Sequence, residues 1–459
     1  MSLPTSHLEQ MRDLVGRGQT RAHAWRLEQL NRLRQLVESH EQEVLDALAS
    51  DLGKPSTEAF FEVVALLQEL KLTIKNLRRW MRPQAIPVPL AQRPGKASVV
   101  PEPLGCVLII GPWNYPFSLT LQPLISALAA GNTAVLKPSE HAPAVADLIA
   151  KLIPLHFEAD VVKVVLGDGL VASELVSMPF DHIFFTGGGA IGRKVLAGAA
   201  ANLTPVTLEL GGKSPAIVLD GADLEVTARR LIWGKGLNAG QTCIAPDHLL
   251  VGAHQRDGLL TALKAARTEM YGDNPLTSQQ LGQIVNDRQF ERLAALLEGA
   301  KAQGRVLLGG ELSREQRRIA PTVIRVDDRQ DPLMQDELFG PLLPMLELGP
   351  LEDALAAIRR DPKPLALYVF GGSEAQQQEV LGCTSSGGVC INDVVMQAGV
   401  PDMPFGGVGG SGMGSYHGRS GFDTFSHQKA VLRRPFRFDF KLRYPPYKLD
   451  LNVLRRLAG

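Results

Sequence analysis

Short apolar runs that alternate with helical segments are the feature that most constrains the fold of this chain. Five such runs occur, at 107–110, 133–136, 161–166, 182–185 and 206–210. Between them, 119–130 and 143–152 have the spacing of helices. Strands separated by helices pair in parallel, and a parallel sheet is covered on both faces. We therefore expect an α/β fold whose ligand site lies at the carboxyl ends of these strands.

At 459 residues the chain is too long for one ordinary core, so two large domains are expected. Before the alternating region, 20–52 and 57–81 show apolar residues at helical spacing, and Gly53 with Pro55 supplies a stop signal for the first. The Pro-rich stretch 83–103 predicts an arm or an edge hairpin that projects from the body.

A second alternating region follows Gly211. It predicts helices around 224–233, 259–270 and 287–302, and short strands around Leu249 and 389–391. Further on, the glycine cluster at 404–414 allows a close approach to a ligand or to another backbone. The last segment, 431–459, is expected to form a strand and an end packed on the surface.

Composition excludes several classes of protein. Lys and Arg together number 48 and so do Asp and Glu, so no net field recruits nucleic acid or an anionic membrane. Four cysteines without paired CxxC spacing indicate a reducing compartment and no structural metal. The start of the chain lacks the pattern of a secretory leader, and no stretch approaches the roughly 18 apolar residues of a membrane span. We expect a cytoplasmic protein without an integral membrane anchor.

Cys243 and Glu209 suggest a nucleophile and a base. Cys243 lies in a stretch of small and polar residues, 238–246, that would leave a thiol approachable. Glu209 is embedded in the apolar run 206–210, where desolvation should raise its pKa and make it a usable base near neutrality. The thiol would form a covalent intermediate and the carboxylate would activate water. Read singly, an inert thiol and a paired strand carboxylate are the alternatives.

A glycine-rich turn follows the run at 182–185. Gly187, Gly189 and Gly192 satisfy the GxGxxG pattern between a strand and a helix, the context of a dinucleotide phosphate site. An acid about 20 residues later holds the ribose in a standard Rossmann unit, and Glu209 stands near that offset. Two roles therefore compete for Glu209, and a turn without a ligand is the alternative for the motif.

Three further polar loops are ambiguous when each is read alone. Asn114 follows the first run and could donate to an oxyanion, although a turn residue is more common there. Lys137 and Glu140 end the second run and could hold a ribose, with a surface turn as the equal alternative. The third loop is 336–341, which combines acids with an aromatic.

Three other residues with reactive side chains are read as structural. His417 is a candidate base, but packing or capping is favoured for it. Cys383 and Cys390 are expected to be ordinary buried thiols.

Read jointly, seven motifs resemble the NAD(P)-dependent aldehyde dehydrogenase superfamily in order and spacing over nearly the whole chain. They are Gly-Pro-Trp-Asn (111–114), Lys-Pro-Ser-Glu (137–140), Phe-Thr-Gly (185–187), Leu-Glu-Leu-Gly-Gly-Lys (208–213), Gly-Gln-Thr-Cys (240–243), Glu-Leu-Phe-Gly-Pro (337–341) and Pro-Phe-Gly-Gly (404–407). The late motifs at 415–418, 425–427 and 443–446 and the short N-terminus resemble the class 3 branch of fatty, aromatic and coniferyl-type aldehyde dehydrogenases. One departure is Gly188-Gly189, where relatives usually carry Ser-Thr.

The resemblance implies specific roles. Cys243 is the nucleophile, Glu209 the general base, and Asn114 with the Cys243 backbone N–H the oxyanion hole. For the cofactor, NAD or NADP, the implied binding residues are Lys137, Glu140, Gly187, Gly192, Glu337, Phe339, Trp113 and Gly211. Residues expected to line the aldehyde tunnel are Tyr115, Trp233, Leu237 and Thr242.

The implied fold is a Rossmann-like cofactor domain, a second α/β catalytic domain and a small β oligomerisation arm. These domains are expected at 1–82 with 104–209 (cofactor), 210–400 (catalytic), 83–103 with 425–445 (arm and bridging strands) and 446–459 (tail). The expected activity is oxidation of a medium- or long-chain aliphatic or an aromatic aldehyde to the acid, through a cysteine thiohemiacetal and thioester, in a homodimer. A cofactor-independent cysteine esterase and a catalytically silent scaffold are the alternatives.

Overall fold

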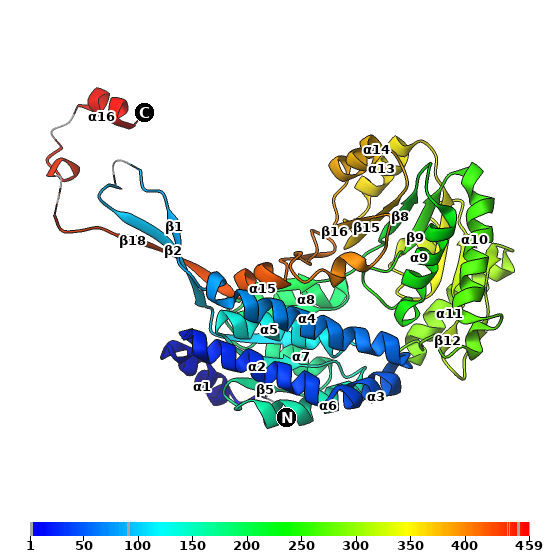
Figure 1. Cartoon of the computed structure of the whole chain (residues 1–459), viewed down its shortest axis with the longest axis horizontal. Coiled ribbons are helices and arrows are strands. Elements are labelled where there is room, and N and C mark those ends of the chain that lie inside the picture. Colours follow the sequence, from blue (N-terminus) through cyan, green and yellow to red (C-terminus); the bar gives the residue numbers. More distant parts are fainter. Residues whose placement is uncertain (1–2, 90–91, 438, 440, 448–449, 459) are drawn as a thin grey trace.

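Two lobes, each built on its own largely parallel sheet, and a three-stranded arm make up the protein (Figure 1). This computed structural model describes residues 3–89, 92–437, 439, 441–447 and 450–458. Positions 90–91, 438 and 440 of the predicted arm, and 448–449 and 459 of the predicted tail, lie outside the described residues. The predicted fold class, two α/β lobes with a small β arm, is confirmed.

The first lobe is organised by a six-stranded sheet in the order β17-β7-β6-β3-β4-β5. Its strands are β3 (Cys106–Ile110), β4 (Thr133–Lys137), β5 (Val162–Val164), β6 (His182–Thr186), β7 (Val206–Glu209) and β17 (Gly412–Met413). The first five pair in parallel, whereas β17 returns antiparallel against β7. Every residue of β3, β4 and β6 is buried, as near-continuous apolar runs predict for a sheet covered on both faces.

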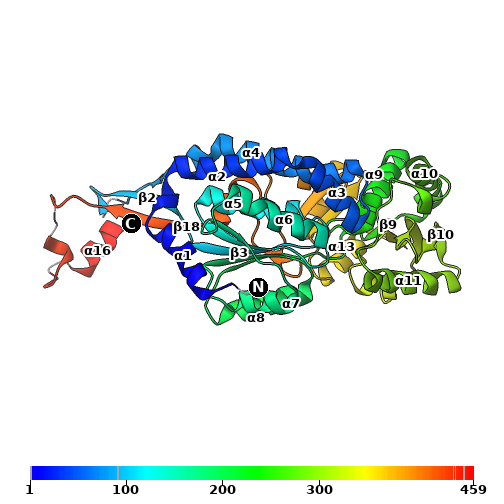
Figure 2. The ribbon, with the colours of Figure 1, turned by 90° about the horizontal axis from the view of Figure 1, so that it is seen from below.

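Helices cover both faces of this sheet (Figure 2). One face carries α2 (His23–Ser39), α3 (Glu41–Leu52), α4 (Ser56–Trp80), α5 (Ser118–Ala130), α6 (Pro143–His156) and α15 (Gly418–Thr424). The other carries α1 (Thr5–Gly16), α7 (Gly169–Val176) and α8 (Gly189–Ala200). Between α1 and α2 lies a 3-10 turn, η1 (Gln19–Arg21).

The single helix predicted over 20–52 is wrong, because the chain breaks it at His40. There φ is −123°, outside the helical range, and the His40 ring lies 2.7 Å from the Glu43 carboxylate. Glu41 and Glu43 in the first turn of α3 are a helix-start signal, since carboxylates are favourable at a helix N-terminus. Gly53 ends α3 in the left-handed conformation, as its position predicts.

The second lobe contains a seven-stranded sheet in the order β10-β13-β14-β9-β8-β15-β16. Its strands are β8 (Pro215–Val218), β9 (His248–Val251), β10 (Val306–Leu308), β13 (Thr322–Arg325), β14 (Leu342–Glu347), β15 (Ala366–Phe370) and β16 (Gly388–Ile391). The lobe's helices are α9 (Leu224–Gly236), α10 (Ala253–Tyr271), α11 (Asp287–Ala302), α12 (Pro332–Gln335), α13 (Leu351–Arg360) and α14 (Glu374–Cys383). Smaller elements are η3 (Leu237–Gly240), η4 (Pro275–Thr277), η5 (Met396–Gly399) and the hairpin of β11 (Leu312–Ser313) and β12 (Arg318–Ile319).

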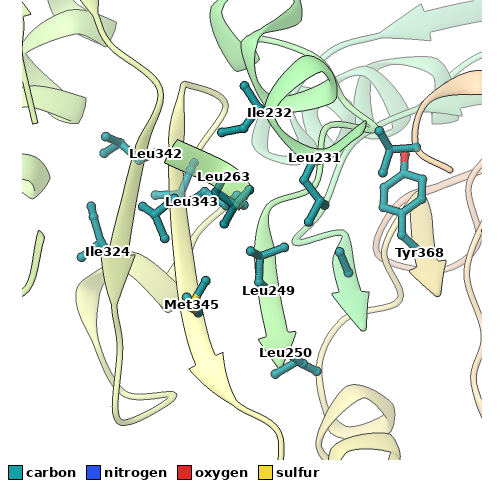
Figure 3. Packing of buried hydrophobic residues seen from close by; sticks show 14 of the residues in the cluster. Leu231, Ile232, Leu249, Leu250, Leu263, Ile324, Leu342, Leu343, Met345 and Tyr368 are labelled. Carbon is teal, nitrogen blue, oxygen red and sulfur yellow. The ribbon is translucent and has the colours of Figure 1, made fainter. Parts of the chain in front are cut away.

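The core of the second lobe is continuous from strand to helix. Figure 3 shows Leu249, Leu343 and Met345 on neighbouring strands, with Leu231 and Ile232 of α9 beside them. These side chains are at most 3% exposed, so each contributes about 1.5–3 kcal/mol of burial. The loops that precede β8 and β9 are therefore held on a rigid support.

The arm consists of β1 (Gln84–Ile86), β2 (Lys96–Pro103) and β18 (Ser426–Arg433), paired antiparallel. It projects from the first lobe, as the Pro-rich stretch predicts (Figure 1). Beyond it, η6 (Lys441–Arg443) and α16 (Leu451–Ala458) extend away from both lobes, so the expected surface-packed end is wrong. Among the described helices, none is long and apolar enough to cross a membrane.

Candidate active site

A cavity of about 980 Å³ lies between the lobes, at the carboxyl edge of the first sheet. Its walls include residues that follow β3, β4 and β6, and Glu209 at the end of β7. Across from them, Cys243, Arg292 and Glu337 come from the second lobe. The volume is at the upper end of small-molecule sites. The ligand site therefore lies at the edge that the alternating pattern predicts.

Glu209 and Cys243 both line this cavity. Glu209 is 2% exposed and neither of its carboxylate oxygens has a hydrogen-bond partner among the described residues. Burial raises its pKa well above the usual range, as its apolar run predicts. Cys243 is half-buried, and burial together with the charges of Glu337 and Glu209 raises the pKa of its thiol. The site therefore pairs a thiol with an unpartnered carboxyl group that has a high proton affinity.

Asn114 is fixed from both ends. Its side-chain Nδ2 donates to the carbonyl of Gln241 at 3.1 Å. Its own carbonyl accepts from Lys54 Nζ and from Asn238 Nδ2, each at 2.8 Å. Asn114 also lines the cavity, so its amide is a preorganised donor. The hydrogen bond to Gln241, two positions before Cys243, links this amide to the Cys243 turn.

Three consecutive left-handed residues precede the Cys243 turn. They are Asn238 (φ 51°), Ala239 (φ 52°) and Gly240 (φ 75°). A Cβ at position 240 would lie 2.3 Å from the carbonyl oxygen of Gly340, so only glycine fits there. The turn is therefore packed directly against the 337–341 loop.

Glu337 and Phe339 of that loop lie on the cavity wall. Burial and the charge of Asp247 raise the pKa of Glu337 to about 8. Phe339 meets Trp113 edge to face, with 5.2 Å between ring centroids. The loop is held by Lys213, which pairs with Asp247 and donates to the carbonyls of Leu333 and Asp336 at 3.0 and 2.9 Å.

At the other end of the cavity, Lys137 and Glu140 form an ion pair. The glycine turn that follows β6 lines the same cavity, with Gly187 and Gly188 on the wall. A Cβ at Gly188 would meet nothing within 4 Å, and this residue is the N-cap of α8. Such a helix start favours an anion. The departure from Ser-Thr at 188–189 is therefore not imposed by crowding.

Gly192 is not among the cavity-lining residues. A Cβ there would lie 2.9 Å from Leu210 Cδ2, so this glycine allows α8 to pack closely on the sheet. Other residues that line the cavity carry no earlier prediction: Asp168, Ser173, Lys194, Gln289 and Arg292. They come from loops and helix faces without a motif, so the sequence offered no signal for them.

The four residues expected in the aldehyde tunnel are likewise not among the residues that line this cavity. The Tyr115 and Thr242 hydroxyls lie 2.7 Å apart, and Thr242 immediately precedes Cys243 in the chain. Trp233 packs against the core of the second lobe, and Leu237 is 5% exposed.

Three residues read as structural can now be placed. His417 is buried 3.9 Å from Glu69 and is not among the residues that line the cavity, which agrees with a packing role. Cys390 is half-buried. Cys383 is exposed, so the expected burial of this thiol is wrong; it ends α14, whose outer face is polar. Within the described ranges, no group of three His, Cys, Asp or Glu residues could hold a metal ion.

Comparisons with known proteins agree with the motifs. A profile described as the aldehyde dehydrogenase family matches residues 17–431. Aldehyde dehydrogenase family 3 member H1 of Arabidopsis thaliana is 44% identical over 96% of this chain and 92% of its own. A Rattus norvegicus protein named "Aldehyde dehydrogenase, dimeric NADP-preferring" is 42% identical over 97% of this chain and 98% of its own.

A solved structure, the substrate-bound state of Staphylococcus aureus AldH, superposes with a TM-score of 0.96 at 40% identity and covers 100% of both chains. Sequence, fold and cavity thus lead to one conclusion. The chain belongs to the aldehyde dehydrogenase family, in its class 3 branch, and is an NAD(P)-dependent aldehyde dehydrogenase.

Proposed function

We propose that this enzyme oxidises its aldehyde through a covalent bond to Cys243. The sulfur adds to the carbonyl carbon, and the resulting oxyanion accepts hydrogen bonds from Asn114 Nδ2 and from the Cys243 backbone N–H. Fixed donors of this kind contribute about 3–4 kcal/mol each at an oxyanion. The observation that carries the proposal is that Cys243, Glu209 and Asn114 all line the cavity whose far end holds Lys137, Glu140 and the glycine turn.

The proposed cofactor residues fit a dinucleotide. Lys137 and Glu140 would hold the adenosine ribose, and Gly187 with the N-terminus of α8 the phosphates. Glu337 would hold the nicotinamide ribose, while Phe339, Trp113 and Gly211 would shape the nicotinamide end. Gly192 would act through helix packing, not by direct contact. A bound nicotinamide would supply the hydride acceptor that turns the thiohemiacetal on Cys243 into a thioester.

Glu209 serves as the base in this scheme. The pKa of the Cys243 thiol is raised, so its proton must leave as the sulfur attacks, and it passes to solvent water. After hydride transfer the unpartnered Glu209 carboxylate removes a proton from water while the water oxygen bonds to the thioester carbon, and that proton then passes to the departing sulfur. The C–S bond then breaks, the acid leaves and the thiol is regenerated.

The aldehyde is proposed to be medium- or long-chain aliphatic or aromatic and to pass Tyr115, Trp233, Leu237 and Thr242. A homodimer in the cytoplasm is proposed as the working form. The projecting arm and a relative named as dimeric support the dimer. The neutral charge balance supports a small-molecule substrate and no nucleic acid.

The test measures NAD(P)H formation with aliphatic, benzylic and cinnamyl aldehydes and with NAD and NADP in turn. Cys243→Ala is expected to abolish turnover with every pair, whereas the matched control Cys383→Ala, at an exposed thiol outside the cavity, retains it. Turnover by Cys243→Ala would remove the residue from the nucleophile role. Ester hydrolysis without any binding of NAD or NADP in calorimetric titration would instead favour a cysteine esterase.

A further inference from the structure

Glu58, in the first turn of α4, makes a contact that reaches from the first lobe into the Cys243 turn. Its Oε2 accepts the backbone N–H of Asn238 at 2.8 Å. These two residues are 180 positions apart, and Asn238 is the second residue of η3 in the second lobe. None of the roles given above involves Glu58.

Asn238 passes this constraint on to the oxyanion site. Its Nδ2 donates to the Asn114 carbonyl at 2.8 Å and to the Gln241 carbonyl at 3.1 Å. The Gln241 carbonyl also accepts from Asn114 Nδ2. Asn238 and Ala239 adopt the left-handed conformation, which costs about 1 kcal/mol or more for a residue other than glycine. Such a turn persists only where its surroundings hold it, and Glu58 is the side chain that holds its first N–H.

A second pair of residues in the first lobe, Lys54 and Glu62, holds the loop that carries Asn114. Lys54 Nζ donates to the Asn114 carbonyl and pairs with Glu62 Oε1 at 2.6 Å. Glu62 Oε2 in turn accepts the N–H groups of Phe117 and Ser118. Lys54 and Glu62 therefore fix the Asn114 loop, while Glu58 fixes the Cys243 turn against it.

We propose that Glu58 is a positioning residue that holds the Cys243 turn in register with Asn114 and thereby sets the geometry of the oxyanion site. The inference rests on the proposed function of Cys243 and Asn114. Glu58 acts through the Asn238 N–H and touches neither the aldehyde nor the cofactor.

Titration of Glu58 gives this role a signature. Burial raises its pKa to about 7, against the Asn238 N–H and the charge of Lys54, which lower it. The titratable groups that interact with it are Lys54, Tyr115 and Tyr271, and the two tyrosines have raised pKa values. Above pH 7 the ionised carboxylate accepts a stronger hydrogen bond than the neutral acid does below it. The turn should therefore be held more firmly as pH rises through 7.

The experiment compares wild type with Glu58→Gln, which keeps an oxygen acceptor but has no charge. The rate of NAD(P)H formation in a single turnover is measured from pH 5.5 to 9. The ratio of the two rates cancels titrations that both proteins share, and it is expected to rise about three- to tenfold with a midpoint near pH 7. The matched control is Glu41→Gln, which removes an exposed first-turn acid of α3 and should leave a flat ratio.

Glu58→Ala supplies the second readout. This variant is expected to lower the rate of the hydride step about tenfold or more at pH 8.5, with unchanged cofactor affinity. In the Asn114→Ala background its effect should be smaller, because Glu58 and Asn114 act as a unit. The inference is overturned if the ratio of wild-type to Glu58→Gln rates is flat with pH and the hydride rate of Glu58→Ala is within twofold of wild type. A slow hydride step in Asn114→Ala would still support the proposed function. If Asn114→Ala is as fast as wild type, the proposed function itself fails. If Glu58→Ala does not fold, the Glu58→Gln ratio decides alone.

Discussion

The α-carbon of Gly211 lies directly against the Glu337 carboxylate, and a Cβ at position 211 would stand 2.3 Å from Glu337 Oε2. Gly211→Ala must therefore displace Glu337 from the cavity wall. We expect cofactor affinity to weaken about tenfold, which corresponds to about 1.4 kcal/mol. Calorimetric titration of the variant with NAD and NADP measures this loss.

The control for this change is Gly299→Ala on the exposed face of α11, where an added Cβ meets nothing within 4 Å. It should bind cofactor as wild type does and gain about 0.5–1 kcal/mol of stability, since alanine is the better helix former. Equal cofactor affinity in wild type and Gly211→Ala would show that Glu337 does not hold the cofactor.

Glu209→Gln separates the two halves of the reaction. The amide cannot take a proton from water, so thioester hydrolysis should slow by a factor of about 10² or more. The first burst of NAD(P)H should persist because the thiol proton passes to solvent, and acyl-enzyme should accumulate on Cys243. Stopped-flow absorbance gives the burst, and mass spectrometry of quenched enzyme gives the acyl adduct. Equal loss of both steps would mean that Glu209 also serves the attack by Cys243.

Asn114→Ala removes the side-chain amide of this cavity-lining residue but keeps the backbone carbonyl to which Lys54 and Asn238 donate. The fold should therefore be retained. The hydride step is expected to fall by about 10²–10³, the usual effect of removing one oxyanion donor. Single-turnover rates with saturating cofactor measure it. A change confined to the apparent aldehyde affinity would indicate that Asn114 binds substrate without stabilising the oxyanion.

Much of the site follows from strand order. Asn114, Lys137 and Glu209 each follow or end a buried parallel strand, so the chain must bring them to one edge of the sheet. The five parallel strands of this sheet are short apolar runs, and all five were found from the sequence. The carbonyl and amide partners of Asn114 were not, because the contacts from Lys54, Asn238 and Gln241 join loops that are distant in the chain and lack any motif.

Other features were hidden for equally physical reasons. The return of β17 against β7 rests on two residues within a glycine cluster, which has no strand periodicity. The break at His40 depends on one local hydrogen-bonding contact within a continuous apolar stripe. The exposure of Cys383 depends on which face of α14 meets the lobe, and this helix has no clear apolar stripe. Local sequence carries no information on such choices when tertiary packing decides them.

The buried carboxyl group of Glu69 should make the stability of the protein depend on pH. Its side chain is buried on α4, where it accepts the Gly418 N–H at 3.2 Å, and burial raises its pKa to about 8 from the ordinary value of 4.5. Between these two values the folded protein binds one proton more than the unfolded chain. The free energy of unfolding therefore falls as pH rises, by up to about 1.4 kcal/mol per pH unit. Below pH 4.5 this contribution is fully present.

Glu69→Gln removes this titration while keeping an oxygen for the Gly418 N–H. The thermal midpoint of wild type should drop relative to that of Glu69→Gln as pH is raised from 5.5 to 8, whereas Glu41→Gln at an exposed position should follow wild type throughout. His417, 3.9 Å away, has a pKa lowered to about 4 by burial, and it remains in both proteins, so its loss of stability below about pH 6.5 cancels in the comparison. Parallel curves for wild type and Glu69→Gln would mean that the Glu69 carboxyl is ionised across this range. The protonation state of the neighbouring His417 ring would then be the first to examine.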